Sequence, residues 1–239
     1  MKGKATGKTT GKAITQKVTG KEEEFIKLHR VLRGELNNAN WHFVTWKCLW
    51  NSIESYSNEM NVAHTFFTLS MRGHLLETLL RLNKMFAKGD DGAASIIYLL
   101  DFAEKNMDIF TAPAAESRKR YEEEMILEKQ VESVKPSQIT RDVIKEHKSK
   151  LKELPVKKMQ KWEDDALAYI DRKVAKKNVD IFDECPVDIE EIDRVIDTVD
   201  GILNVYSVAY DGQRLDKDLV FTHGIKNMLD AIRDGRKKQ

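Results

Sequence analysis

Residues 54–86, ESYSNEMNVAHTFFTLSMRGHLLETLLRLNKMF, decide the fold class. Their apolar residues recur every three or four positions, which places them on one face of an α-helix. That face consists of Val62, Phe66, Leu69, Leu76, Leu79 and Leu80, with Ala63, Phe67, Met71, Leu75 and Leu82 beside it. A face this wide predicts a central helix that other helices cover.

The flanking segments also have helical patterns. Residues 88–92 predict a turn, and residues 95–110 predict a second, antiparallel helix that forms a hairpin with the first. Residues 188–212 start with an aspartate-led capping pattern, Asp188 with Glu191, and predict a helix that docks onto the hairpin. Upstream, a single buried face is predicted from four residues: Trp46, Leu49, Trp50 and Ile53.

Length and composition agree with an all-α fold class, an antiparallel helical bundle. The chain has 239 residues, of which 33% are charged and 41% are apolar, and it lacks a linker that would separate two domains. Residues 114–161 are very polar and predict a projecting or weakly packed helical arm. We therefore expect a tail at residues 1–21, a helical domain at 22–212, and a short helix with a basic end at 213–239.

The tail combines lysines with glycines and threonines and has no acidic residue, so we expect it to be disordered. Its lysines are candidates for contacts with RNA phosphates, although a merely solubilising extension is an alternative reading. These candidates are Lys2, Lys4, Lys8, Lys12, Lys17 and Lys21.

Several kinds of chemistry lack their usual signatures. Two cysteines, Cys48 and Cys185, are too few for a disulfide framework, and no run of about eighteen apolar residues predicts a membrane span. No phosphate-binding glycine loop occurs, and the histidines lack metal-ligand spacing; His64 and His74 are interpreted as core residues. We expect a cytoplasmic protein with no cofactor, no metal site and no membrane partner.

Three stretches together resemble the HEPN superfamily, in particular its abortive-infection U branch. They are WKCLW at residues 46–50, LLRLNKMF at 79–86 and WEDDALAYID at 162–171, within a resemblance that covers about residues 22–212. In that branch a helix begins with the pattern Trp-Arg-Asp-Lys-x-x-Ala-His-x-Asp, and residues 162–171 have the same frame. The resemblance implies a helical bundle that pairs as a homodimer.

HEPN ribonucleases share an Arg-x4-6-His motif, whose chemistry needs no metal. At the corresponding positions this chain has Glu163 and Tyr169, although Asp171 still fits the frame. A carboxylate at the arginine position repels the phosphate that arginine would bind, so we predict an inactive ribonuclease site. A second match to the loose spacing, Arg141 with His147, lies in the predicted arm without the tryptophan frame.

Three functional hypotheses follow. The first is a non-catalytic HEPN-like module that binds RNA or a protein partner, for which the resemblance implies a role in phage defence or a toxin–antitoxin-type system. The second is a metal-independent ribonuclease that uses Arg141 and His147. The third is a helical scaffold with no nucleic-acid role.

Overall fold

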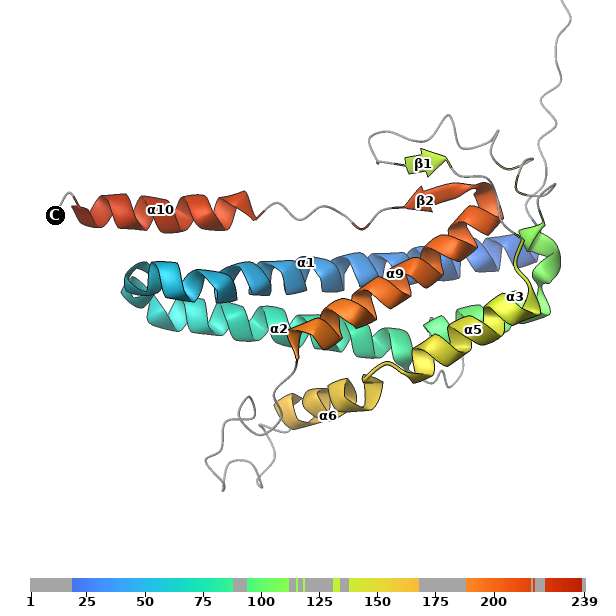
Figure 1. The fold of residues 1–239 in the computed structure, drawn as a ribbon, viewed down its shortest axis with the longest axis horizontal. Helices are drawn as coiled ribbons and strands as arrows, with labels where there is room; N and C mark the ends of the chain where they lie inside the picture. The colour runs from blue at the N-terminus through green and yellow to red at the C-terminus, as the bar shows by residue number, and fades with distance from the viewer. Residues whose placement is uncertain are drawn as a thin grey trace, which may run out of the picture.

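The computed structural model describes residues 19–87, 94–111, 115, 118, 131–133, 138–167, 188–215, 217 and 222–237. Helices dominate these residues, so the all-α fold class is confirmed (Figure 1). The helices are α1 (Gly20–Val62), α2 (His64–Phe86), α3 (Ile96–Lys105), η1 (Met107–Phe110), α5 (Arg141–Lys152), α6 (Val156–Leu167), α9 (Ile189–Asp211) and α10 (His223–Lys237). Two short strands, β1 (Val131–Ser133) and β2 (Gln213–Leu215), form an antiparallel pair.

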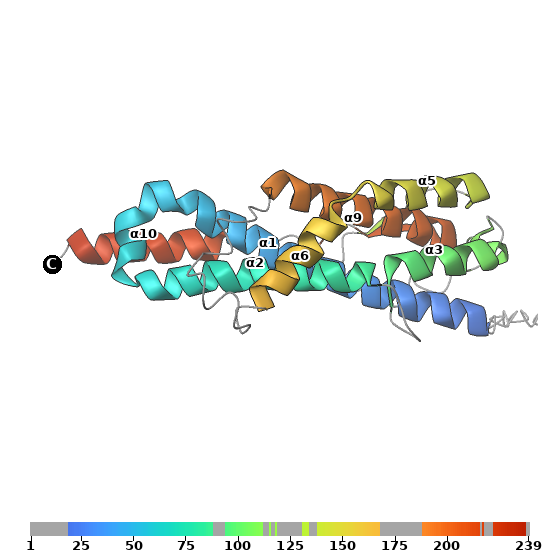
Figure 2. The same ribbon diagram turned by 90° about the horizontal axis from the view of Figure 1, so that it is seen from below.

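The prediction of one continuous helix over residues 54–86 is wrong. Ala63 has φ −132° and ψ 52°, which ends α1 and lets α2 return along it as a hairpin (Figure 1). Neither glycine nor proline marks this position, so packing rather than local preference sets the break. The antiparallel partner of α2 is therefore α1, whereas α3 continues beyond the end of α2 in the same direction (Figure 2).

The break changes which apolar residues are buried. Val62, Phe66 and Leu69 are 62%, 58% and 63% exposed, although the continuous helix predicted them to be core. In the upstream stripe Trp46 and Leu49 are buried, but Trp50 and Ile53 are exposed. The predicted faces are thus wrong near the end of the hairpin, because a turn there replaces the straight helix.

Four helices close the main core. Helix α1 contacts α3 and α9, and α5 contacts both α3 and α9, so the four enclose a common interior. Its centre is filled by residues with no exposed side-chain surface, including Leu32, Leu36, Phe43, Leu99, Phe110 and Tyr206. We refer to this apolar interior as the main core.

The described part of the predicted polar arm does not project. In α5, Ile144 and Leu151 are buried, and in α6 the side chain of Met159 is buried as well. Helix α5 packs against α3 and α9, while α6 packs against α2. The prediction is wrong here because a thin apolar stripe is enough for a helix that touches its neighbours along one narrow line.

Helix α9 begins and ends where its sequence predicts. The Asp188 side chain accepts a hydrogen bond from the Glu190 amide at 2.9 Å, and Gly212 takes a left-handed conformation with φ 76°. Glu191 does not complete a capping box; it pairs with Lys158 of α6 at 2.6 Å. The left-handed glycine turns the chain into β2, which pairs with β1.

A second, smaller apolar cluster lies at the end of the α1–α2 hairpin. Helix α10 covers it by inserting Leu229 between Leu49, Met60 and Phe67. Polar contacts surround this cluster: the Tyr56 hydroxyl donates to Asp230 at 2.7 Å, and Arg233 pairs with Glu59 at 3.1 Å. We refer to this cluster as the hairpin-end core.

Candidate functional site

The motif frame begins on α6. Residues 162–167 lie in the last part of this helix, whereas Tyr169, Asp171 and the side chain of Glu163 lie outside the described residues. Helix α6 crosses α2 (Figure 2), and the Asn83 side-chain amide donates a hydrogen bond to the Met159 carbonyl at 3.1 Å. The start of the frame is therefore held against the α1–α2 hairpin.

Arg141 and His147 are not brought together. Arg141 is the exposed first residue of α5, whereas His147 is buried against Tyr206, with 3.4 Å between its Nδ1 and the tyrosine hydroxyl. Burial lowers the pKa of His147 and raises the pKa of Tyr206. A histidine in this position packs in the core, and little of its surface is open to solvent.

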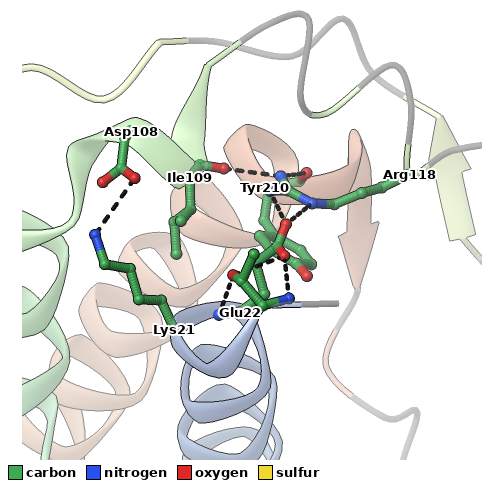
Figure 3. A network of polar contacts seen from close by, with 7 residues as sticks. Lys21, Glu22, Asp108, Ile109, Arg118 and Tyr210 are labelled. Atoms are coloured by element: carbon green, nitrogen blue, oxygen red, sulfur yellow. Dashed lines mark hydrogen bonds and ion pairs between the residues drawn. The ribbon is translucent and has the colours of Figure 1, made fainter. Parts of the chain in front are cut away.

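Of the six lysines that are candidates for contacts with RNA phosphates, the structure describes Lys21. Lys21 is the second residue of α1 and pairs with Asp108 at 3.4 Å, with both side chains more than half exposed (Figure 3). Lys2, Lys4, Lys8, Lys12 and Lys17 lie outside the described residues. An exposed pair of this kind contributes little to stability, so Lys21 is able to exchange Asp108 for a phosphate.

Arg118 stands at the centre of a polar network beside the start of α1 (Figure 3). Its guanidinium pairs with Glu22 and donates to the carbonyls of Ile109 at 2.8 Å and Tyr210 at 2.9 Å. Its guanidinium carbon also lies 4.0 Å from the centre of the Tyr210 ring. All three nitrogens of the Arg118 guanidinium bond to protein groups. This arginine therefore connects the start of α1 to η1 and to the end of α9.

Glu22 is fixed on its other side as well. Burial disfavours its charge, but hydrogen bonds from Thr19 and Arg118 outweigh burial and lower the pKa of Glu22. The Thr19 hydroxyl and the Glu22 carboxylate form a capping box at the start of α1. No sequence signal pointed to Arg118, because its partners come from three distant parts of the chain.

A cleft of about 330 Å³ lies between α1, α9 and β2. Arg33 forms its buried wall, pairing with Asp200 and donating to the Asn204 side-chain oxygen at 3.1 Å. Asn204 accepts a further bond from the Leu215 amide at 3.0 Å. Since these groups bond to one another, the network joins α1 to α9 and β2.

His29 lines the same cleft and is almost completely buried. Its Nε2 lies 3.1 Å from the Leu203 carbonyl, and burial lowers its pKa to about 4. The ring is therefore neutral at pH 7, and its ring N–H donates to that carbonyl. His29 joins α1 to α9 without carrying charge.

Two other histidines face each other across the hairpin. The Nδ1 atoms of His42 on α1 and His74 on α2 are 2.9 Å apart, and both rings are partly buried. Burial lowers the pKa of each ring. Sequence reasoning interpreted His74 as a core residue and missed this pair, because its members are 32 residues apart and form no local motif.

Charged neighbours surround the histidine pair. Glu77 of α2 bonds to Arg81 at 2.6 Å, and Arg81 also bonds to Glu35 of α1 at 3.0 Å. The Glu77 carboxylate favours the charged form of His42, whereas Arg81 disfavours it. Among the described residues, no group of three or more histidine, cysteine or acidic side chains is already arranged to hold a metal ion.

Comparison with known protein families gives a match over most of the chain. The model of the family described as AbiU2, HEPN_AbiU2, matches residues 22–232. That range includes the hairpin, the motif frame and most of α10. No curated protein and no solved structure matches the chain. Within the part of the chain that the structure describes, no helix is long and apolar enough to cross a membrane.

Proposed function

Since this chain belongs to the AbiU2 family of HEPN proteins, we propose that it is a non-catalytic member, which acts by binding RNA or a protein partner. The main support is the residue pair at the motif positions, Glu163 and Tyr169. Glutamate cannot stabilise the negative charge that develops on phosphorus, and tyrosine, with a reference pKa near 10, is a poor base at neutral pH. Both roles of the ribonuclease motif therefore lack a suitable group.

The second match to the motif supports the same proposal. A ribonuclease needs its histidine within hydrogen-bond reach of the 2′-hydroxyl and its arginine beside the phosphate. His147 is covered by Tyr206, while Arg141 is the exposed first residue of α5. This arrangement weighs against the ribonuclease alternative.

The described surface favours a protein over RNA as the partner. Exposed apolar side chains gather near the end of the hairpin, at Val62, Phe66 and Leu69. The case for RNA rests on the lysines of residues 1–21, of which the structure describes Lys21 alone. The net charge of the chain is only +1, so no overall positive field attracts RNA. A second copy of the chain is the first candidate partner, and cytoplasmic homodimerisation is part of the proposal.

The experiment is incubation of the purified protein with a mixture of tRNA and single-stranded RNA in a metal-free buffer containing a chelator. We expect no cleavage by the natural chain and cleavage by a variant with Glu163→Arg and Tyr169→His together. The matched control carries Glu163→Gln and Tyr169→Phe, which removes the native side chains without restoring the motif.

Each outcome has a distinct meaning. Cleavage by the natural chain contradicts the non-catalytic assignment, and His147→Ala then tests the second motif. Cleavage by the restored variant alone supports a degenerate site at residues 163–169. If RNA is retained in low salt and released as salt rises, RNA is the partner. If the chain neither binds RNA nor self-associates, the scaffold alternative stands.

A further inference from the structure

Helix α10 and the hairpin end present surfaces that fit each other. Leu229 of α10 has no exposed side-chain surface, and helical spacing places Ile225 and Ile232 on the same face of the helix. We use the name docking surface for the residues of the hairpin end that receive this face, which are Leu49, Tyr56, Glu59, Met60 and Phe67. The contact therefore joins an amphipathic helix to an apolar surface with a polar edge.

Polar contacts make this fit specific. The Tyr56 hydroxyl donates to Asp230 at 2.7 Å, while Arg233 pairs with buried Glu59 at 3.1 Å. The Arg233 guanidinium carbon also lies 4.1 Å from the centre of the Tyr56 ring. A helix that docks here needs an acidic residue directly after its buried leucine and an arginine three positions further on, and α10 has this pattern.

The main core does not depend on where α10 docks. Strand β2, which precedes α10, pairs with β1, and Lys217 pairs with Asp197 of α9. Helix α10 itself lies along the hairpin and reaches beyond its turn in both views (Figure 1 and Figure 2). A single small apolar cluster holds it there, so α10 can leave the docking surface while the main core stays folded.

We propose that two copies of the chain exchange α10, so that the helix of each copy lies on the docking surface of the other. This inference rests on the homodimerisation that is part of the proposed function, and it names the surface through which the copies pair. A second copy carries the same helix and the same docking surface, so the contacts of Leu229, Asp230 and Arg233 form again between the copies. Both docking surfaces are then filled, which closes the assembly at two chains.

The exchanged pair has an advantage that the single chain lacks. The covalent connection keeps each α10 near its own docking surface and by itself favours the single chain. However, Val62, Phe66 and Leu69 at the same end of the hairpin are more than half exposed. Because α10 begins a few residues after Lys217, exchange brings the hairpin ends of the two copies close together. Apolar surface that the single chain leaves in water is then buried between the copies, which stabilises the pair.

The test mixes two full-length variants, each of which breaks one side of the same ion pair. Glu59→Arg damages the docking surface and keeps the natural helix, whereas Arg233→Glu damages the helix and keeps the natural docking surface. Each variant alone brings like charges together wherever α10 docks. In the mixture, exchange joins the natural helix of the first variant to the natural docking surface of the second, and the two reversed charges meet each other.

The measurement is native mass spectrometry with one variant of the pair labelled by a heavy nitrogen isotope, which separates mixed dimers from dimers of one variant. Because like charges at an interface strongly disfavour pairing, we expect roughly tenfold more mixed dimer in the mixture than dimer in either variant alone. The matched control reverses Glu146 or Lys150, an exposed ion pair within α5 at 2.7 Å. Either reversal should leave the dimerisation of the natural chain unchanged.

A second mixture repeats the test without reversed charges. Phe67→Ser damages the docking surface and Leu229→Ala damages the helix, so a mixed dimer with exchanged helices has one intact contact, and a dimer of either variant alone has none. Mixed dimers in either mixture, absent from the separate variants, support the exchange. Absence of mixed dimers from both mixtures overturns it.

The natural chain separates this proposal from homodimerisation itself. If the natural chain and all four variants form dimers equally, the copies pair through another surface, which overturns the exchange and leaves homodimerisation standing. If the natural chain stays at 27.6 kDa at high concentration, the exchange and homodimerisation both fail. The non-catalytic assignment is decided separately by the RNA cleavage experiment.

Discussion

Helix α1 contributes to two apolar cores that are built in different ways. The main core collects side chains from α1, α2, α3, α5, α6 and α9, and many of them have no exposed surface. The hairpin-end core consists of Leu49, Met60, Phe67 and Leu229, with partly exposed neighbours. Stability in the main core therefore comes from apolar burial on several sides, whereas the smaller core depends on one added helix.

The polar contacts near the main core also connect more elements than those at the hairpin end do. Near the main core, Arg33, His29 and Arg118 connect separate elements from buried or half-buried positions. At the hairpin end, partly exposed Arg233 pairs with buried Glu59, and Arg236 donates to the Asn58 carbonyl at the surface. Because only a small apolar cluster fastens α10 to the hairpin, α10 should separate from it before the main core unfolds.

The largest expected effect comes from a cavity in the main core. Leu36→Ala removes a side chain with no exposed surface, and it should lower the free energy of unfolding by about 2–5 kcal/mol. Denaturant titration followed by circular dichroism measures this loss. Leu69→Ala, at a 63% exposed position, should change the same free energy by no more than about 0.5 kcal/mol. Equal losses in the two variants would contradict the assigned core.

Acid should weaken the main core through His29. Its pKa is about 4 in the folded chain, against an ordinary value of 6.5, so the unfolded chain binds the proton more readily. The stability contributed by neutral His29 is complete above pH 6.5 and is lost as the pH falls, by about 3 kcal/mol at pH 4. The measurement is the free energy of unfolding at pH 7 and pH 4 for the natural chain and for His29→Gln.

Comparison with the glutamine variant isolates the histidine. Glutamine is able to donate a hydrogen bond to the Leu203 carbonyl but does not titrate. Carboxylates with lowered pKa values, such as Glu22, weaken both proteins alike as the pH falls. If the natural chain and His29→Gln lose the same stability between pH 7 and pH 4, the neutral buried histidine is not the cause.

A smaller and more local effect is expected at the hairpin end. Leu229→Ala should reduce the free energy of α10 docking by about 2 kcal/mol, the low end for a buried leucine, because few residues pack around it. Hydrogen exchange should speed up in α10 and in the adjoining part of α1, and remain slow in α9. Faster exchange throughout the molecule would mean that the two cores unfold as one unit.

The two cores also differ in how far the sequence predicts them. Helix α9 has local signals at both ends, Asp188 and Gly212, and the structure confirms them. The hairpin break at Ala63 has no such signal, and the α10 residue that packs near it, Leu229, comes more than 150 residues later. The arm at 114–161 was misread since polarity alone does not show that Ile144 finds a buried place between other helices.

One part of the candidate site can be predicted from the sequence, the motif frame, and another part cannot, the histidine pair. A local pattern identifies residues 162–171 as the motif frame and shows that Glu163 and Tyr169 replace arginine and histidine. The histidine pair depends on how α1 and α2 align, so His42 and His74 meet only once the break is known. Patterns within one helix are visible in a sequence, whereas contacts between helices depend on where each helix ends.

The smallest expected effect on stability concerns two neighbouring phenylalanines of the hairpin end. Phe66 is 58% exposed and Phe67 is 2% exposed, so Phe66→Ser should leave the free energy of unfolding within about 0.5 kcal/mol, whereas Phe67→Ser should detach α10. If exposed apolar residues here pair two copies of the chain, Phe66→Ser should lower the mass measured by light scattering from that of a dimer toward 27.6 kDa. A natural chain that stays at the monomer mass at high concentration contradicts homodimerisation. A dimer that Phe66→Ser leaves intact must pair through another surface, and the exposed apolar side chains near α10 would then serve a different partner.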